Sequence, residues 1–520
     1  MKRKYLIFAI CLFLVTVMAV LSACGGTTDN NTSGTDTTAT TSTADNSELV
    51  VAISSDLFRT DPSWDASGSS RNVFINAYER ILGFDDEGNL IPALASSYKR
   101  LDEKTWDFTL RDGAKFWDGT PVTANDVKFT IERAAKDDTS RLNSYVASIA
   151  EVQVVSDTEF KVVTTDPDAI LPNRLANVFV ISEASVADYD AGKIVAPLGS
   201  GPYKITVWDQ NKQVVLERNE NYNLGTPKIE KITFRVITEA ATRIAELQAG
   251  GVDLISDLNP DMISLLSSNS NLSVKSVPSN RTMFIGFNTW GDGPLSDARV
   301  RQAINYAIDK DSIVKSLFLG YGAVSSQVVN SNAFGYNDEI KPYPYDVAKA
   351  KEMLTEACYP NGFTIDFNSP TGKYLLDKDV AQVVADQLAQ VGIKVNLQLE
   401  EFNSYWDRLL NKELKGMFLM SIGNYYADPD FAIDLWLYSK KRGLYYNTPV
   451  TDALIEQEKV AMTTEERKQI FDELMTKIYN DAPWLFMVEY QDIYAVNNSL
   501  QGWEPRSDQL MIFNDAYFSS

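Results

Sequence analysis

Residues 106–134 read WDFTLRDGAKFWDGTPVTANDVKFTIERA. Apolar and polar residues alternate from Trp106 to Arg111, and this period of two predicts a half-buried strand. Two Asp-Gly pairs follow and predict turns, because glycine accepts positive φ. Thr123 stands three residues before Asp126, a spacing close to a capping box, and it predicts the start of an amphipathic helix. These local patterns predict a strand, two turns and a capped helix, and they name no function.

The order of residues in and before this stretch carries a second signal. It matches the pattern P-x-LA, a polar stretch, then F-x-LR-x-G-x-x-F-x-DG-x-P-V-T-A-x-D-V. The matching positions are Pro92, Leu94, Ala95, Phe108, Leu110, Arg111, Gly113, Phe116, Asp118, Gly119, Pro121, Val122, Thr123, Ala124, Asp126 and Val127. This agreement resembles the signature of the family 5 solute-binding proteins, the peptide- and nickel-binding group of ABC importers. The resemblance runs from about Glu48 to the C terminus.

The resemblance implies an α/β fold with two lobes, similar to periplasmic binding proteins of the large class, and a hinge between the lobes. It implies lobe I at 48–283 with an inserted subdomain at about 84–195, lobe II at 284–488, and a C-terminal return to lobe I at 489–520. Helix and strand periodicities alternate beyond residue 345, which is typical of an α/β lobe. Cys358 stands where the family has glycine, and we expect its thiol to be packed inside the lobe.

The N terminus has the pattern of an exported lipoprotein. Residues 1–23 combine a positively charged start with an apolar run, which predicts a signal peptide. The end of this run, Leu21-Ser22-Ala23-Cys24, resembles a lipobox, and this implies cleavage before Cys24 and lipidation of its thiol. The alternative is an uncleaved membrane anchor. Residues 24–47 are almost entirely polar and small, which predicts a disordered tether. We therefore expect a lipid-anchored protein on the extracytoplasmic face of the cell membrane.

Composition excludes several classes of function. The formal net charge of the 520-residue chain is −22, which makes nucleic acid a poor partner because its phosphates would be repelled. Histidine is absent, so a Ser-His-Asp triad, a Cys-His dyad and a histidine-based zinc site are all excluded. A hydrolase that uses two carboxylates stays possible. We expect no metal, no cofactor and no catalytic residues.

The loop at 421–430, SIGNYYADPD, is the segment expected to select the ligand. In peptide-binding members of the family this loop often carries an Asp that holds the α-ammonium group of the peptide, and its backbone pairs with the peptide. Counting back from Asp428-Pro429, that position holds Tyr425, with Asn424 beside it. An ammonium group facing these residues would lack about 1.5–3 kcal/mol of charge-assisted hydrogen bonding. Another carboxylate would have to replace the Asp, or the ligand has no free amine there.

Candidate ligand contacts come from this loop and from aromatic residues that are alternatively part of the core. They are Trp64, Phe284, Phe402, Trp406, Ser421, Ile422, Gly423, Asn424, Tyr425, Tyr426 and Asp428.

The favoured hypothesis is a monomeric substrate-binding lipoprotein of an ABC importer, with the membrane permease as its partner. Its lobes close on oligo- or dipeptides and leave them chemically unchanged. An oligosaccharide ligand is the first alternative, because the family's Asp is missing and aromatic residues are abundant. A secreted carboxylate-dependent hydrolase and a peptide-holding chaperone are the alternatives from other classes.

Overall fold

The structure is a computed structural model that describes residues 47–519. The predicted signal peptide, the predicted lipidation site Cys24 and the predicted tether up to residue 46 lie outside the described residues.

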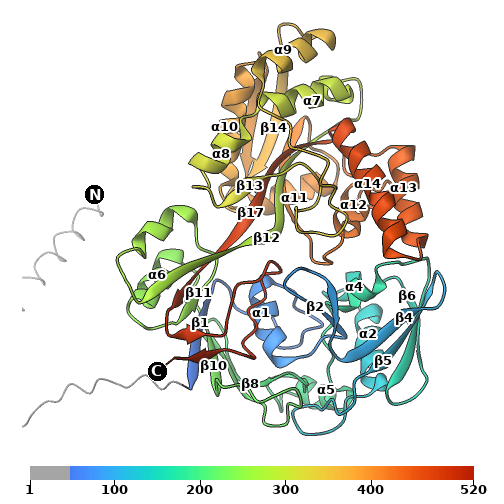
Figure 1. Cartoon of the computed structure of the whole chain (residues 1–520), viewed down its shortest axis with the longest axis vertical. Helices are drawn as coiled ribbons and strands as arrows, with labels where there is room; N and C mark the ends of the chain where they lie inside the picture. Colours follow the sequence, from blue (N-terminus) through green and yellow to red (C-terminus); the bar gives the residue numbers. More distant parts are fainter. Residues whose placement is uncertain (1–46, 520) are drawn as a thin grey trace, which may run out of the picture. The chain divides into compact units, whose positions relative to one another are not determined.

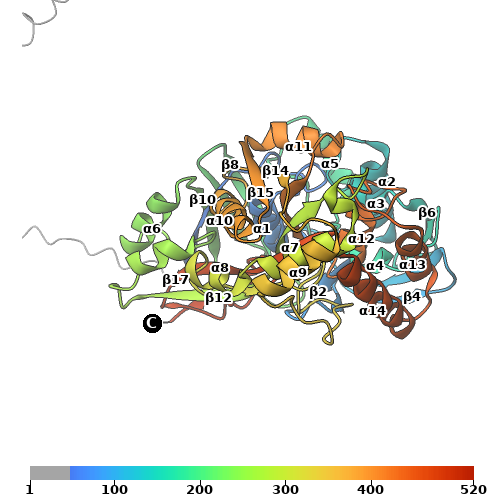
Figure 2. The same cartoon turned by 90° about the horizontal axis from the view of Figure 1, so that it is seen from above.

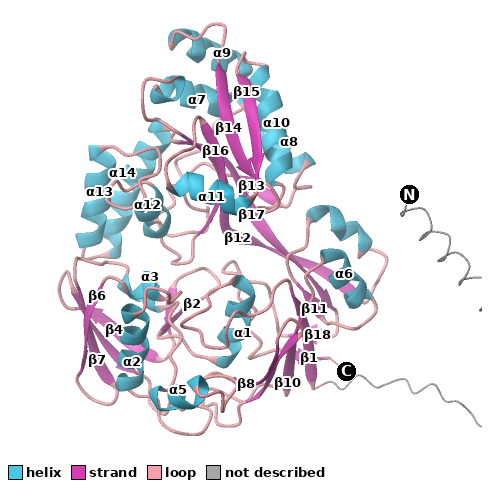
Figure 3. Ribbon diagram, turned by 180° about the vertical axis from the view of Figure 1, so that it is seen from behind, coloured by secondary structure: helices cyan, strands magenta, loops and turns pink. Residues whose placement is uncertain are grey.

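An eleven-stranded mixed sheet runs through both halves of the molecule (Figures 1 and 3). Its strands follow the order β15-β14-β16-β12-β17-β11-β1-β10-β9-β8, and β13 pairs with β17. The bounds are β1 (Glu48–Ile53), β8 (Tyr203–Asp209), β9 (Gln213–Arg218), β10 (Lys231–Val236), β11 (Leu254–Ile255), β12 (Leu272–Phe287), β13 (Gly322–Val324), β14 (Thr364–Pro370), β15 (Lys394–Glu400), β16 (Met417–Gly423) and β17 (Trp484–Asn497).

The long strands β12 and β17 connect the two halves. They pair antiparallel, and their register shifts between Pro278 and Thr282. Proline has no backbone N–H and cannot continue the ladder, so the irregularity falls at this point. On one side of it Val277 packs against the core of lobe I, and on the other side Met283 belongs to the core of lobe II. The chain therefore crosses between the lobes in β12 and returns in β17. The predicted boundaries at 283/284 and 488/489 fall inside these strands and stay predictions.

Lobe I contains three hydrophobic cores. The largest one forms around β1, β10 and α1 (Gly68–Ala77), where alternate residues of β1 such as Leu49 and Val51 are fully buried. Against it lie α5 (Glu183–Asp190), β18 (Leu500–Gln501) and β19 (Tyr517–Phe518). A smaller core forms between β11, α6 (Ala240–Gln248) and η1 (Pro260–Leu265).

The stretch quoted first builds the third core, to which β2 (Leu82–Phe84) and β3 (Leu90–Pro92) also contribute. Its strand is β5 (Thr105–Leu110) and its helix is α2 (Ala124–Lys136), and Thr123 and Asp126 form a capping box, so both predictions are confirmed. Stacking of Phe108 on Phe160, with ring centres 5.1 Å apart, joins β5 to its neighbour. The sheet order is β4 (Ala95–Arg100), β5, β7 (Glu159–Thr164) and β6 (Ile149–Val154), and α3 (Asn143–Val146) and α4 (Leu171–Leu175) follow nearby.

Lobe II has two cores, one on each side of its sheet. One core packs against η2 (Pro294–Ser296), α7 (Ala298–Ala307), α8 (Lys310–Ser316), α9 (Val347–Glu356) and α10 (Asp377–Ala389). The other contains α11 (Phe402–Leu410), α12 (Asp430–Trp436), α13 (Pro449–Val460) and α14 (Thr464–Asp481). Figure 2 shows α13 and α14 side by side at one end of lobe II and α10 at the other.

The expectation of a packed Cys358 is wrong. The residue is exposed and its φ is +68°, in the left-handed region. This backbone conformation, which costs a non-glycine residue about 1 kcal/mol, leaves the thiol in solvent while its neighbours Ala357 and Tyr359 contact the core.

Lys310 is a buried lysine with one hydrogen bond, from its ammonium group to the carbonyl oxygen of Asn305 at 2.9 Å. Burial lowers its pKa to about 7. An unfolded lysine titrates near ~10.4, so between about pH 7 and 10 the unfolded chain binds more protons and the folded state gains stability as pH rises.

We therefore expect Lys310→Met to raise the midpoint of thermal unfolding at pH 6, by an amount equivalent to a few kcal/mol (roughly 1.4 per pKa unit). The difference between the thermal midpoints of the variant and the wild type, measured by calorimetry, should become smaller towards pH 10. Lys315→Met, at an exposed lysine of the same helix, should show a difference that does not change with pH. A constant gain for Lys310→Met would contradict this account.

Candidate ligand-binding cleft

Two adjoining cavities lie between the lobes and share Lys373, Tyr374 and Tyr425. We call the first the aromatic chamber; it has a volume of about 630 Å³ and is lined by α3 and α4 of lobe I and by β16, α11, α12 and residues 441–442 of lobe II. We call the second the polar chamber; it has a volume of about 740 Å³ and extends to residues 53–72 of lobe I and to Asp377 of lobe II. Both lobes therefore contribute walls to one cleft.

The end of β16 presents an open strand edge to the aromatic chamber. On one side β16 pairs with β12 as far as Gly423, whereas β14 pairs with it at Met417 and Phe418. From residue 419 onward, the β14 side of β16 has no strand partner among the described residues. The N–H of Asn424 donates to the carbonyl oxygen of Asn280 in β12 at 2.9 Å, so the backbone groups of Ser421 and Gly423 lie on the opposite edge. This edge has no strand partner within residues 47–519, and the hydroxyl of Tyr374 faces the Ser421 backbone there.

Tyr425 lies beside this edge and against lobe I. A Cβ atom on Gly423 would lie 3.0 Å from the Tyr425 ring, so the absence of a side chain there lets the ring pack on the strand. The guanidinium of Arg71 lies 5.1 Å from the ring centre, and the amide of Asn177 donates to the carbonyl oxygen of Tyr425 at 3.0 Å. Both contacts come from lobe I, which makes Tyr425 a residue that both lobes hold in place.

A row of aromatic rings forms the lobe II wall of the aromatic chamber. Trp406 lies 5.6 Å from Phe402 and 5.9 Å from Trp436 between ring centres. Phe402 in turn contacts Tyr374 edge-on at 6.2 Å. The turn of α11 that carries Phe402 and Trp406 begins at Glu401, whose carboxylate accepts hydrogen bonds from two backbone N–H groups of the first turn. The wall can therefore accept apolar or planar groups.

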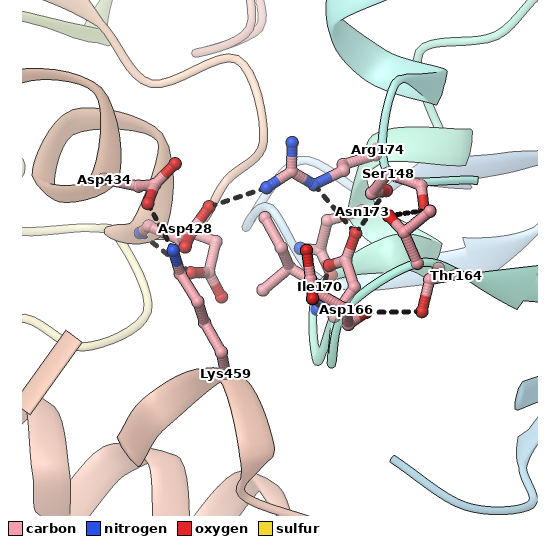
Figure 4. Close-up of polar contacts among 12 residues, drawn as sticks. Ser148, Thr164, Asp166, Ile170, Asn173, Arg174, Asp428, Asp434 and Lys459 are labelled. Atoms are coloured by element: carbon pink, nitrogen blue, oxygen red, sulfur yellow. Dashed lines mark hydrogen bonds and ion pairs between the residues drawn. The ribbon is translucent and has the colours of Figure 1, made fainter. Parts of the chain in front are cut away.

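Arg174 links the lobes beside this wall (Figure 4). It lies on α4 of lobe I, and its guanidinium is 3.1 Å from a carboxylate oxygen of Asp430 at the start of α12 in lobe II. It also lies 3.4 Å from Asp168 of its own lobe. Asn173, on the same helix, donates to the carbonyl oxygen of Tyr426 at 2.8 Å. One short helix thus holds the 421–430 loop by an ion pair and a hydrogen bond.

Burial sets the charge balance of this network. Burial by itself would lower the pKa of Arg174, but Asp168 and Asp430 outweigh it, so the pKa is raised and the guanidinium stays charged. Burial raises the pKa of Asp430, and Arg174 opposes this. Burial and the neighbouring Asp430 also raise the pKa of Glu458. Asp430 therefore depends on Arg174 for compensation, and Glu458 depends on Arg467.

Seven of the eleven predicted contacts line the aromatic chamber together. They are Phe402, Trp406, Ser421, Ile422, Gly423, Tyr425 and Tyr426. Asn424 lines a smaller cavity of about 260 Å³ on which Tyr425 also borders.

The remaining three predicted residues lie elsewhere. Phe284 is buried and stacks on Trp484, with ring centres 3.7 Å apart, inside a core of lobe II. Asp428 is buried and accepts two hydrogen bonds from Arg467, at 2.7 and 2.9 Å. Trp64 lies under the guanidinium of Arg133, which is 4.2 Å from its ring centre. Each has a structural partner, and none lines the chambers.

Three further residues line the chambers but lie in no motif that the sequence analysis could identify. Lys373 and Tyr374 follow β14 and border both chambers, and Arg442 ends the run Lys440-Lys441-Arg442. That basic run in an acidic chain was the one sequence signal that could have drawn attention to Arg442.

The polar chamber holds carboxylates that could replace the family's missing Asp. Asp257 accepts hydrogen bonds from the hydroxyls of Ser54 and Ser256, and Asp379 is exposed on α10. Neither forms an ion pair within the described residues, so both are open to a cationic group of a ligand. Within residues 47–519, no cluster of acidic or cysteine side chains is arranged to hold a metal ion.

Comparison with known proteins agrees with this architecture. The family model "Bacterial extracellular solute-binding proteins, family 5 Middle" matches residues 89–443. The glutathione-binding protein GsiB of Pectobacterium atrosepticum is 32% identical over 486 residues, covering 90% of this chain and 94% of its own. HbpA2 from Haemophilus parasuis has a TM-score of 0.82 at 21% identity, over 91% of this chain and 100% of its own. DppA from Helicobacter pylori, an ABC transporter-associated periplasmic binding protein in complex with the peptide STSA, has a TM-score of 0.73 at 23% identity, over 91% and 98%.

The two lobes and the cleft between them define a periplasmic-binding-protein-like α/β fold, which confirms the predicted fold class. The chain belongs to the bacterial extracellular solute-binding proteins of family 5, as the signature stretch indicated. None of the helices in residues 47–519 combines the length and apolar character needed to cross a bilayer.

Proposed function

We propose that this protein is the monomeric substrate-binding lipoprotein of an ABC importer, and that it binds peptides between its lobes and delivers them to the membrane permease. The observation that carries the proposal is the open edge of β16 at Ser421 and Gly423, which faces a cavity between the lobes. An extended peptide can add to such an edge as a further strand, and its backbone hydrogen bonds tolerate varied side chains.

The relatives support a short peptide as cargo. The name of GsiB specifies glutathione, a tripeptide, and the Helicobacter pylori protein is in complex with the peptide STSA. For a ligand with a free amine, Asp257 and Asp379 of the polar chamber would supply the carboxylate that position 425 lacks. Binding requires no covalent step, because affinity for the conformation in which both lobes contact the ligand is sufficient to drive closure.

Isothermal titration calorimetry of the purified protein with a library of two- to nine-residue peptides and a panel of oligosaccharides tests the cargo class. We expect saturable binding by peptides and none by the sugars. The aromatic wall of Phe402, Trp406 and Trp436 favours oligosaccharide as the second candidate, since such rings can stack on sugar faces. Binding of sugars without binding of peptides would establish that alternative.

The hydrolase alternative is tested with the same ligands. Mass spectrometry of the ligand after prolonged incubation should recover it unchanged. Appearance of a cleaved product would show that the protein is a hydrolase and not a carrier.

Membrane anchoring through Cys24 is part of the proposal and has its own test. We expect Cys24→Ser to move the protein from the membrane fraction of cells to the soluble extracytoplasmic fraction. The lipidated protein is anchored stably by its acyl chains, and the variant has no thiol to carry them. Cys358→Ser, at the other cysteine that follows residue 23, should leave the protein with the membrane. Retention of the Cys24 variant in the membrane would indicate an uncleaved anchor instead.

A further inference from the structure

The aromatic chamber is positively charged within an acidic protein. The whole chain has a formal net charge of −22, yet five cationic side chains and two carboxylates line this chamber. Both carboxylates already have a cationic partner, since Asp430 pairs with Arg174 and Asp434 pairs with Lys459. The other four cations form no ion pair within residues 47–519; they are Arg141, Lys373, Lys441 and Arg442.

Arg442 is the most enclosed of these four cations. Its guanidinium lies 4.9 Å from the ring centre of Trp436 and 5.4 Å from that of Trp406, so it is held against the aromatic wall. Its side-chain N–H groups have no acceptor in the part of the chain that the structure describes. Burial lowers the pKa of Arg442, and no carboxylate opposes this effect. The half-buried guanidinium thus lacks the partner that such a group ordinarily has.

A second donor at the same wall is also unsatisfied. The indole N–H of Trp436 is buried and has no hydrogen-bond partner within the described residues. Leaving such a group unpaired costs about 1–3 kcal/mol. A ligand acceptor in the chamber can reach the partly exposed guanidinium of Arg442, whereas the buried N–H of Trp436 becomes accessible only if its ring moves. A carboxylate fits best, because its two oxygens match the planar fork of a guanidinium.

We infer that the aromatic chamber is a subsite for a carboxylate of the cargo, either its C terminus or an acidic side chain, with Arg442 as its principal donor. The inference rests on the proposed function, since it takes the cleft to be the peptide site. The open edge at Ser421 and Gly423 lines the same chamber, so a peptide bound there places a side chain or its C terminus within it. Lys373, whose ammonium group lies 4.6 Å from the Phe402 ring centre, adds positive charge at the chamber's other end.

The test compares three probes by calorimetry at pH 7.5: the tripeptides Ala-Glu-Ala and Ala-Gln-Ala, and the C-terminal amide of Ala-Gln-Ala. The series removes one carboxylate at a time without changing shape. We expect one of the two steps to lower affinity at least tenfold in the wild-type protein. Arg442→Gln should reduce that step to twofold or less, and Arg442→Lys, which keeps the charge but not the fork, should give an intermediate value.

Lys440→Gln is the matched control. It removes a positive charge two positions away, but Lys440 is exposed, pairs with Glu456 and does not line the aromatic chamber. We expect it to leave all three affinities within twofold of the wild type. Circular dichroism and the thermal midpoint verify that each variant is folded.

The outcomes separate this inference from the proposed function. If the three probes bind the wild type equally, or if Arg442→Gln and Arg442→Lys both keep the full preference, the carboxylate subsite is wrong while peptide binding stands. If no probe and no member of the peptide library binds, the proposed function fails and the inference fails with it.

Discussion

Arg174→Leu is expected to weaken peptide binding on the order of 100-fold. The substitution leaves Asp168 and Asp430 buried without their shared cation, and breaking a buried pair in this way typically costs about 3–5 kcal/mol. Because the pair joins α4 of lobe I to α12 of lobe II, much of that cost falls on the conformation in which both lobes contact the ligand. A ligand that needs this conformation loses affinity by the same amount, about tenfold per 1.4 kcal/mol.

Calorimetry with the tightest-binding library peptide measures this loss. Arg111→Leu is the control, because Arg111 forms a similarly buried pair with Glu79 at 2.9 Å inside lobe I. It should lower the thermal midpoint and leave peptide affinity within about threefold. Equal losses of affinity in the two variants would mean that Arg174 acts through general stability and not through the contact between lobes.

Gly423→Val is expected to reduce peptide affinity by about ten- to a hundredfold, or about 1.4–3 kcal/mol. The new Cβ would lie 3.0–3.2 Å from three atoms of the Tyr425 side chain, so this side chain has to shift by a few tenths of an ångström. The added methyl groups would also enter the chamber beside the open edge where the peptide backbone is proposed to pair. The extended backbone at 423 suits valine, so the effect on folding should be small.

The matched control is Gly293→Val in the same lobe, where a Cβ meets no atom within 4 Å. Gly293 does not line the chambers, and we expect its affinity for the same peptide to stay within twofold. Unchanged affinity in Gly423→Val would show that neither the Tyr425 position nor the open edge contributes to binding.

The strand and the helix of the signature stretch were predictable because their signals are local, and the two-lobe fold was predictable from the resemblance to a family. The alternation from Trp106 to Leu110 and the cap at Thr123 act over a few residues, and the structure has the strand and the helix there. The loop at 421–426 was named from its distance to Asp428-Pro429 in a family pattern; it lines the aromatic chamber, and its role in ligand binding stays a prediction.

The partners of individual side chains were not predictable, because they come from distant parts of the chain. Asp428 is a predicted ligand contact, and its partner Arg467 lies 39 positions later in the chain. Phe284 stacks on Trp484 across 200 positions. The positive charge of the aromatic chamber likewise comes from both lobes, since Arg141 of lobe I and Arg442 of lobe II line the same cavity. The sequence pattern around either residue does not indicate that the two lie near each other.

A crystal structure of the protein with its tightest-binding library peptide tests the central claim most directly. We predict an intact peptide between the lobes, beside Tyr425, with its backbone hydrogen-bonded to Ser421 and Gly423 on the open edge of β16. Density for the peptide outside both chambers, or a cleaved peptide, would contradict a carrier that holds its cargo in this cleft.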